Sequence, residues 1–152
     1  MSANSFRIVR ASRAAALVLL IATAGPASAA ENFRARLSPV PIDSSTRAQT
    51  TGLGEATAVL DGNKLTITGE FGGLAGAATK AELKSGVAKG VRGPSFAQLT
   101  VPEGTAGTFK AEVTLTPAQV EHLHAGRVYI ELASTSAPDG NLWGWLLPPR
   151  AD

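Results

Sequence analysis

The chain has 152 residues with a hydrophobic fraction of 44%, enough for one domain with a real core but short for two. The absence of cysteine excludes disulfides, thiolate metal sites, haem attachment through Cys-x-x-Cys-His and a lipid-modified N-terminal cysteine. The formal charge of +2 comes from arginines near the N-terminus, because residues 30–152 carry eleven basic and twelve acidic side chains. The basic side chains of residues 30–152 form no cluster in the sequence, which argues against nucleic acid as a partner.

The first 29 residues have the layout of a secretory signal peptide. Three arginines within residues 7–13 precede an apolar run at 14–24, and small residues at 27–29 suit a cleavage site. The apolar run is shorter than the roughly 20 residues that a transmembrane helix needs, and a twin arginine is absent. We therefore predict a cleavable Sec-type signal peptide at 1–29 and a periplasmic or secreted domain at 30–152, with no membrane span after removal of the signal.

The first half of this domain reads as strands joined by turns. Residues 33–37 alternate polar and apolar side chains, and the proline- and serine-containing stretch 38–52 reads as a loop. Residues 54–60 and 64–71 face each other across Asp61-Gly62-Asn63, which is a strong hairpin pattern because Asp-Gly tolerates the positive φ of tight turns.

Three further strands are predicted at 79–84, 95–101 and 108–115, the last with the cleanest alternation in the chain. Glycines at 86, 90 and 93 give the intervening segment 85–94 some likeness to a phosphate-binding loop. Because no Lys-Ser/Thr pair opens a helix after it, a connecting loop is the favoured interpretation.

One short helix is predicted after Thr116. Pro117 suits the first helical position, Gln119 completes a capping box with Thr116, and Gly126 ends the helix. About eight short strands and a single helix predict an all-β antiparallel sandwich or barrel.

The C-terminal hairpin at 127–147 organises the domain. Its two apolar runs flank a Ser/Pro/Asp-Gly turn and alternate with the period of two that a strand needs. The aliphatic side is expected to face the core: Val128, Ile130, Leu132, Leu142 and Leu146. The opposite side collects Tyr129, Glu131 and both tryptophans of the protein, Trp143 and Trp145.

A series of short motifs follows the predicted strands: Phe33-x-Ala35-x-Leu37, Gly54-x-Ala56, Gly73-Leu74, Ala81-x-Leu83-x-x-Gly86, Gly93-Pro94, Leu115-Thr116-Pro117, Leu123-x-x-Gly126-x-x-Tyr129 and Pro138-Asp139-Gly140-Asn141-Leu142-x-Gly144. The closing segment from Pro138 to Gly144 is the most specific of them. In this order the motifs resemble the CHRD family, the domain first defined in chordin and widespread in exported bacterial proteins.

The resemblance implies an immunoglobulin-like or copper/zinc superoxide dismutase-like β-sandwich, in a family whose biochemical role is mostly undefined. It also implies that this chain is a divergent member. Relatives typically have His-x-His at 82–84, Asn-x-His at 131–133, and a glutamate, an arginine and a glutamine at 141, 143 and 145. Here these positions hold Glu82-Leu83-Lys84, Glu131-Leu132-Ala133, Asn141, Trp143 and Trp145, all changes being on the outward side of the alternation.

The sequence contains few residues that could bind a metal ion or act in catalysis. Metal binding needs three or four converging ligands, whereas His122 and His124 are the only histidines and point roughly 200° apart on a helix. No serine lies in a Gly-x-Ser-x-Gly setting. Glu82 and Glu131 could share one face, but an ordinary cross-strand charge pair between Lys84 and one of them is the favoured interpretation. We expect no cofactor and no enzymatic activity; a metal-binding or redox-associated protein is the alternative.

The aromatic side of the hairpin is the main functional candidate. Tryptophan and tyrosine dominate many binding surfaces, and large exposed apolar patches are uncommon on isolated domains. The predicted binding surface comprises Tyr129, Glu131, Trp143, Trp145, Glu82 and Lys84. It indicates an accessory or structural subunit that binds another exported protein or complex, or alternatively a glycan. A third possibility is that the tail 148–152 or the loop 38–52 covers the aromatic rings.

Overall fold

The computed structural model describes residues 29–41 and 44–149. The predicted signal peptide lies outside these residues except for Ala29. The elements in chain order are β1 (Glu31–Pro39), β2 (Leu53–Asp61), β3 (Lys64–Gly72), β4 (Ala78–Ser85), β5 (Ser95–Leu99), β6 (Gly107–Thr114), α1 (Pro117–His124), β7 (Val128–Ser134) and β8 (Leu142–Trp145). Each predicted strand and the helix are present, with ends that differ by one or two residues.

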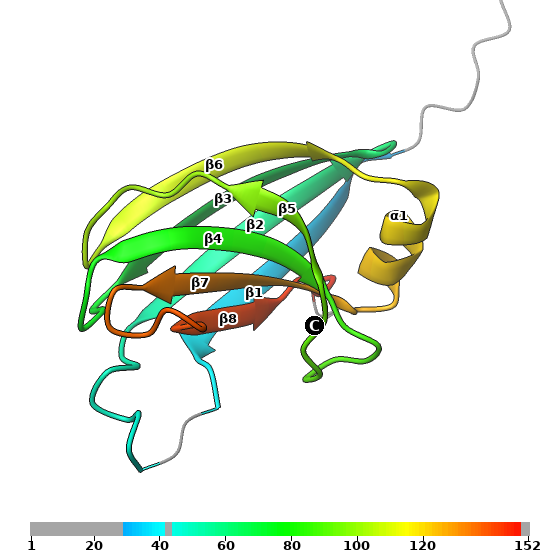
Figure 1. Ribbon diagram of the computed structural model, residues 1–152. Coiled ribbons are helices and arrows are strands. Elements are labelled where there is room, and N and C mark those ends of the chain that lie inside the picture. The colour runs from blue at the N-terminus through cyan, green and yellow to red at the C-terminus, as the bar shows by residue number, and fades with distance from the viewer. Residues whose placement is uncertain (1–28, 42–43, 150–152) are drawn as a thin grey trace, which may run out of the picture.

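The strands form one antiparallel sheet in the order β5-β4-β7-β8-β1-β2-β3-β6. This sheet curls nearly into a barrel, with β1, β2, β3 and β6 forming one layer and β5, β4, β7 and β8 the other (Figure 1). β1 joins the layers, because it pairs with β2 along most of its length and with β8 through Ser38 and Pro39. The prediction of an all-β sandwich with one short helix is confirmed.

Aliphatic and aromatic side chains fill the space between the layers. Leu65 and Ile67 of β3 and Val128, Ile130 and Leu132 of β7 are fully buried there, as their alternation predicts. Burial of a side chain of this size stabilises the fold by about 2 kcal/mol, so the inward faces of these strands supply much of the driving force for folding.

Helix α1 closes one end of the barrel (Figure 1). Thr116 and Gln119 form the predicted capping box, in which each accepts a hydrogen bond from the backbone N–H of the other. At the C-terminal end Gly126 has φ of 66°, and the N–H groups of Gly126 and Arg127 donate to the carbonyls of Leu123 and His122. This is a Schellman motif, for which glycine is favoured because its left-handed φ costs little.

The β2–β3 hairpin turns more tightly than the sequence pattern indicates. Asp61 pairs with Lys64, so only Gly62 and Asn63 form the loop. Gly62 has φ of 61°, whereas Asp61 and Asn63 keep negative φ. The glycine alone therefore supplies the positive φ that a two-residue hairpin loop requires.

Over the described part of the chain, no helix is long and apolar enough to cross a membrane.

The outer side of β7, which supplies Tyr129 and Glu131 to the predicted binding surface, is buried. All seven residues of β7 are buried, including Tyr129 at 0% and Glu131 at 4% exposure. β7 is a central strand between β4 and β8, and its outer side is covered by their side chains and by the loop 86–94. Alternation along the strand correctly separates the two sides, but it does not reveal a cover that comes from elsewhere in the chain.

Candidate functional site

The hairpin of β7 and β8 brings the aromatic residues together. Tyr129 lies opposite Trp145 and Glu131 opposite Trp143 in the β7–β8 register, so all four side chains share the outer side of the sheet. The ring centres of Tyr129 and Trp145 are 4.4 Å apart, and those of the two indoles are 5.9 Å apart at 63°. Tyr129 is fully buried, whereas both indoles are only partly buried. The tyrosine is therefore the floor of the cluster and the indoles are its accessible part.

The loop 86–94 holds down one side of this cluster. The N–H of Gly93 donates to the Tyr129 hydroxyl at 3.0 Å, and Gly86 N and Ser85 N donate to the carbonyls of Arg127 and Pro94. The bond from Gly93 gives the buried tyrosine hydroxyl the partner that it needs, while the two backbone bonds fix the ends of the loop. The loop is thus a connection that also covers the base of the aromatic cluster.

A charged row borders the aromatic cluster on β4. Glu82 faces Glu131 in the β4–β7 register, and Lys84 lies between these carboxylates. The Lys84 ammonium donates to Glu131 Oε1 at 2.5 Å and lies 3.5 Å from Glu82 Oε2. Lys80 lies 3.5 Å from the same Glu82 oxygen. The lysines thereby offset the repulsion that two facing carboxylates create.

These contacts shift the pKa values of two groups. Partial burial raises the pKa of the Glu82 carboxyl, but the charges of Lys80 and Lys84 lower it by more, so the net direction is downward. Partial burial lowers the pKa of Lys84, but its hydrogen bond to Glu131 and the nearby carboxylates raise it by more. Both shifts favour the charged forms of Glu82 and Lys84 at neutral pH, as expected for members of an ion-pair network.

Arg92 links the charged row to the indoles, and its sequence context did not single it out. Its guanidinium carbon lies 5.8 Å from the centre of the Trp143 ring, and its Nη1 lies 3.5 Å from Glu131 Oε2 and donates to the Asp139 carbonyl at 2.9 Å. Such a position over an indole face is typical of a cation–π contact. Arg92 reaches the hairpin from a glycine-rich loop distant in sequence, so periodicity carried no sign of it.

Gly140 shows how closely this side is packed. It has φ of 129°, and a Cβ placed there would lie 3.2 Å from Glu131 Cδ and 3.3 Å from Arg92 Nη2. The carboxylate and guanidinium thus rest on the backbone of the β7–β8 turn, which requires glycine both for space and for φ.

Asn141 lies beside this site but is not part of its surface. It is fully buried, accepts from the Ser134 hydroxyl at 2.7 Å, and donates to the Thr51 carbonyl at 2.6 Å. The expectation that position 141 faces outward is therefore wrong, and Ala133 is likewise buried at 3%. The loop that precedes β2 contacts Asn141 through Thr51, and Leu147, the residue before the segment 148–152, pairs with Arg34 of β1.

The two histidines do not converge on a common point. His122 Nδ1 is hydrogen-bonded to the Ser85 hydroxyl at 2.7 Å. His124 Nε2 instead lies 3.0 Å from a carboxylate oxygen of Glu31. Within residues 29–41 and 44–149, no group of three or more His, Asp or Glu side chains is arranged to hold a metal ion.

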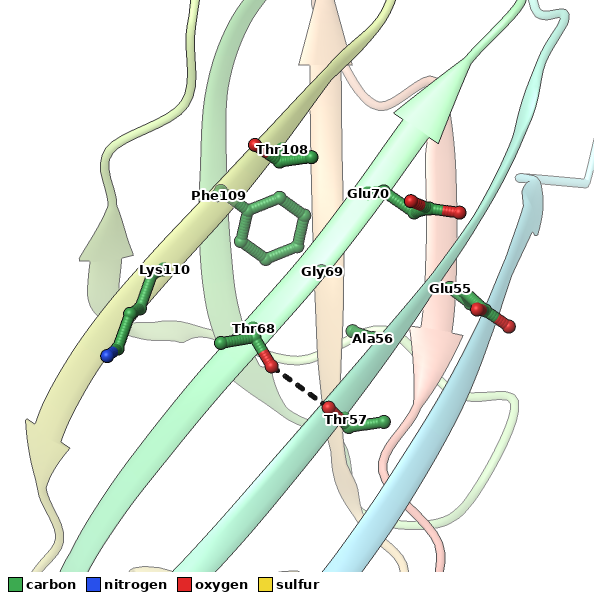
Figure 2. Close-up of a pocket in the computed structure, with 9 residues that line it drawn as sticks. All are labelled: Glu55, Ala56, Thr57, Thr68, Gly69, Glu70, Thr108, Phe109 and Lys110. Atoms are coloured by element: carbon green, nitrogen blue, oxygen red, sulfur yellow. Dashed lines mark hydrogen bonds between the residues drawn. The ribbon is translucent and has the colours of Figure 1, made fainter.

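The opposite layer carries a separate polar hollow. Its walls are exposed side chains of β2, β3 and β6, with Phe109 packed beside Gly69 at its base (Figure 2). The hydroxyls of Thr57 and Thr68 are hydrogen-bonded at 3.0 Å. The hollow does not adjoin the aromatic cluster, and none of its residues stands out in the sequence as a functional candidate.

Comparison with known proteins gives one match. A family model described as CHRD domain matches residues 33–146. This range includes β2 to β8, all of β1 except its first two residues, and every residue of the aromatic cluster and charged row. Neither the curated proteins nor the solved structures contain a match to the chain.

Proposed function

Because the chain belongs to the CHRD domain family, we propose that it is a non-catalytic, exported β-sandwich module that binds another protein through the Trp143/Trp145 surface. We define this surface as Trp143, Trp145, Lys84, Glu82 and the Arg92 guanidinium. Tyr129 and Glu131 support it from below. An accessory or structural role in an exported assembly fits a small β module of an extracellular type of domain and the signal-peptide pattern at residues 1–29.

The observation that carries this proposal is the pair of partly exposed indoles above a fully buried tyrosine. Rigid aromatic side chains that are already held in place lose little conformational entropy on binding, and tryptophan and arginine are enriched among residues that dominate binding energy. Charges of both signs lie beside the rings: the cations are Lys80, Lys84 and Arg92, and the anions are Glu82 and Glu131. This mixture suits a protein partner with complementary charges at its rim.

A glycan is the less favoured ligand for the same surface. The indole planes are inclined by 63° to each other, and Arg92 lies over the Trp143 ring. They therefore do not form one flat platform for stacking along a sugar chain.

Site-specific photo-crosslinking tests the proposal. Benzoylphenylalanine placed at Trp143 or Trp145 keeps an aromatic side chain there, and the same residue at the exposed Thr57 of the opposite layer is the control. We expect positions 143 and 145, but not 57, to crosslink to one exported protein in the secreting host. That protein, once purified, should bind the wild-type chain and lose affinity by about tenfold or more when Arg92 becomes glutamate. Equal crosslinking at all three positions, or none at 143 and 145, would contradict the proposal.

Elemental analysis of the purified protein distinguishes the proposed binding module from the alternative of a metal-binding or redox-associated protein. Stoichiometric copper, zinc or iron that is lost when both His122 and His124 become alanine would favour that alternative over partner binding.

A further inference from the structure

The two end strands of the sheet, β5 and β6, meet without pairing. β6 is hydrogen-bonded along its whole length to β3, and among the described residues no ladder joins it to β5. Figure 1 shows β6 at the upper margin of its layer with β5 in front of it. β6 therefore presents an eight-residue edge with unpaired backbone groups, which is a template for another strand.

The side chains along this edge are incompletely covered. Leu65 and Ile67 of the neighbouring β3 are fully buried, whereas their partners Val113 and Ala111 of β6 are only partly buried. An added strand would complete the coverage of these core-facing side chains.

The sequence of β6 matches itself when reversed. In an antiparallel pair of two copies centred on Ala111, Lys110 lies opposite Glu112 of the second copy, and Glu112 opposite Lys110. On the core-facing side Phe109 then meets Val113, and at the ends Thr108 meets Thr114. Residues that are directly opposite lie on the same side of a sheet, so charges meet opposite charges and apolar groups meet apolar groups.

Other registers lack this match. If the pair were centred on Lys110 or on Glu112, that residue would lie opposite the same residue of the second copy, and like charges would meet. If the centre lay between two residues, the outward-facing side chains of one copy would lie opposite core-facing side chains of the other. β5 offers no equivalent, because centring it on Ala97 places Phe96 opposite Gln98. Lysine on an edge normally discourages pairing, but here a second copy supplies the glutamate that it needs.

We propose that β6 is a self-association edge, through which two copies form a two-fold antiparallel dimer centred on Ala111. The interface is isologous, and it closes at two copies because each chain contributes its single β6 edge. One strand pair buries a small area, so the dimer is weak and depends on protein concentration.

Charge reversal tests this proposal. The chain is expressed from Met1, purified in the form that the host produces, and studied by sedimentation equilibrium from about 1 µM to about 1 mM. We expect a monomer–dimer equilibrium that Lys110→Glu and Glu112→Lys each weaken by about tenfold or more, since each creates two like-charged pairs. Mixing the two single variants should restore dimers, as should the double variant, because opposite charges again meet.

Control variants and measurements check that the β6 edge itself joins the two copies. Glu112 also contacts Lys64 of its own chain at 2.8 Å, so Lys64→Ala, which removes that contact alone, should leave the dimer unchanged. Circular dichroism checks that the variants are folded, and hydrogen exchange should show added protection of residues 108–114 in the dimer. A chain that stays monomeric throughout, single variants that dimerise like the wild type, or protection confined to other strands would overturn the proposal.

Discussion

Lys84 makes the least exposed ion pair of the candidate site. Its side chain is 18% exposed and that of Glu131 is 4% exposed, whereas the Lys64–Glu112 pair on the opposite layer is more than half exposed at both ends. Removing one member of a buried pair leaves an uncompensated charge, which costs far more than the loss of an exposed pair.

We therefore predict that Lys84→Met lowers the free energy of unfolding by about 3 kcal/mol, while Lys64→Met leaves it nearly unchanged. Adding Glu131→Gln to Lys84→Met should recover part of the loss, because without Lys84 the buried Glu131 carboxylate keeps only its 3.5 Å contact with the half-exposed Arg92. Urea denaturation of the variants measures these differences. Equal effects of Lys84→Met and Lys64→Met would show that burial of the first pair has no energetic consequence.

The charged row also predicts a pH dependence. The pKa of Glu82 lies below its ordinary value of 4.5, so its contribution to stability is complete above pH 4.5 and is lost as the pH falls through the folded pKa. The pKa of Lys84 lies above its ordinary value of 10.5, so its contribution is complete below pH 10.5 and is lost as the pH rises through the folded pKa.

Accordingly, the stability difference between the wild type and Lys84→Met should shrink as the pH falls through the folded pKa of Glu82 and as the pH rises through that of Lys84. Chemical denaturation at a series of pH values provides the measurement. A difference that does not shrink at either acidic or alkaline pH would contradict these shifts.

Two glycines with positive φ differ in backbone conformation and in surroundings, with φ of 61° at Gly62 and 129° at Gly140. A Cβ at Gly140 would contact Glu131 and Arg92, whereas a Cβ at Gly62 has nothing within 4 Å. We predict that Gly62→Ala costs about 1 kcal/mol from backbone strain alone. Gly140→Ala should cost more and should also change the fluorescence of the chain by displacing Arg92 from Trp143. Thermal melts with fluorescence detection record both effects, and similar costs at the two positions would contradict the packing described around Gly140.

At the level of elements, the loop 86–94 depends on the hydroxyl of Tyr129. Tyr129→Phe removes the acceptor for the Gly93 N–H while keeping the ring against Trp145. We predict a loss of about 1 kcal/mol and faster trypsin cleavage after Lys89 and Arg92, both of which lie in this loop. Peptide mapping of limited digests shows where cleavage occurs; an unchanged cleavage rate in the loop would mean that other contacts hold it.

The elements also show what could be predicted from sequence. Which side of β7 and β8 each residue takes follows from period-two alternation alone, and the capping box at Thr116 is a local pattern. The burial of Tyr129 and Glu131 could not be predicted in this way, because it depends on β4, β8 and a loop that begins more than thirty residues earlier. Arg92 was missed for the same reason: its role comes from the position of its loop and not from any local period.

At the level of the whole molecule, the two layers have different surfaces. The layer with β7 and β8 carries the indoles and the charged row, and the layer with β6 ends in the unpaired edge. Dimerisation through β6 and partner binding through the Trp143/Trp145 surface therefore use separate parts of the fold. Lys110→Glu is expected to weaken self-association without changing partner affinity, and Arg92→Glu to do the reverse.

The central claim is that a protein partner covers the indoles, and both tryptophans of the chain lie in that surface. Labelling this chain alone with 5-fluorotryptophan gives two ¹⁹F resonances that report on Trp143 and Trp145. On titration with the crosslinked partner, purified and unlabelled, we predict that both resonances shift and lose accessibility to a soluble paramagnetic reagent. Binding that leaves both resonances and their accessibility unchanged would contradict this claim.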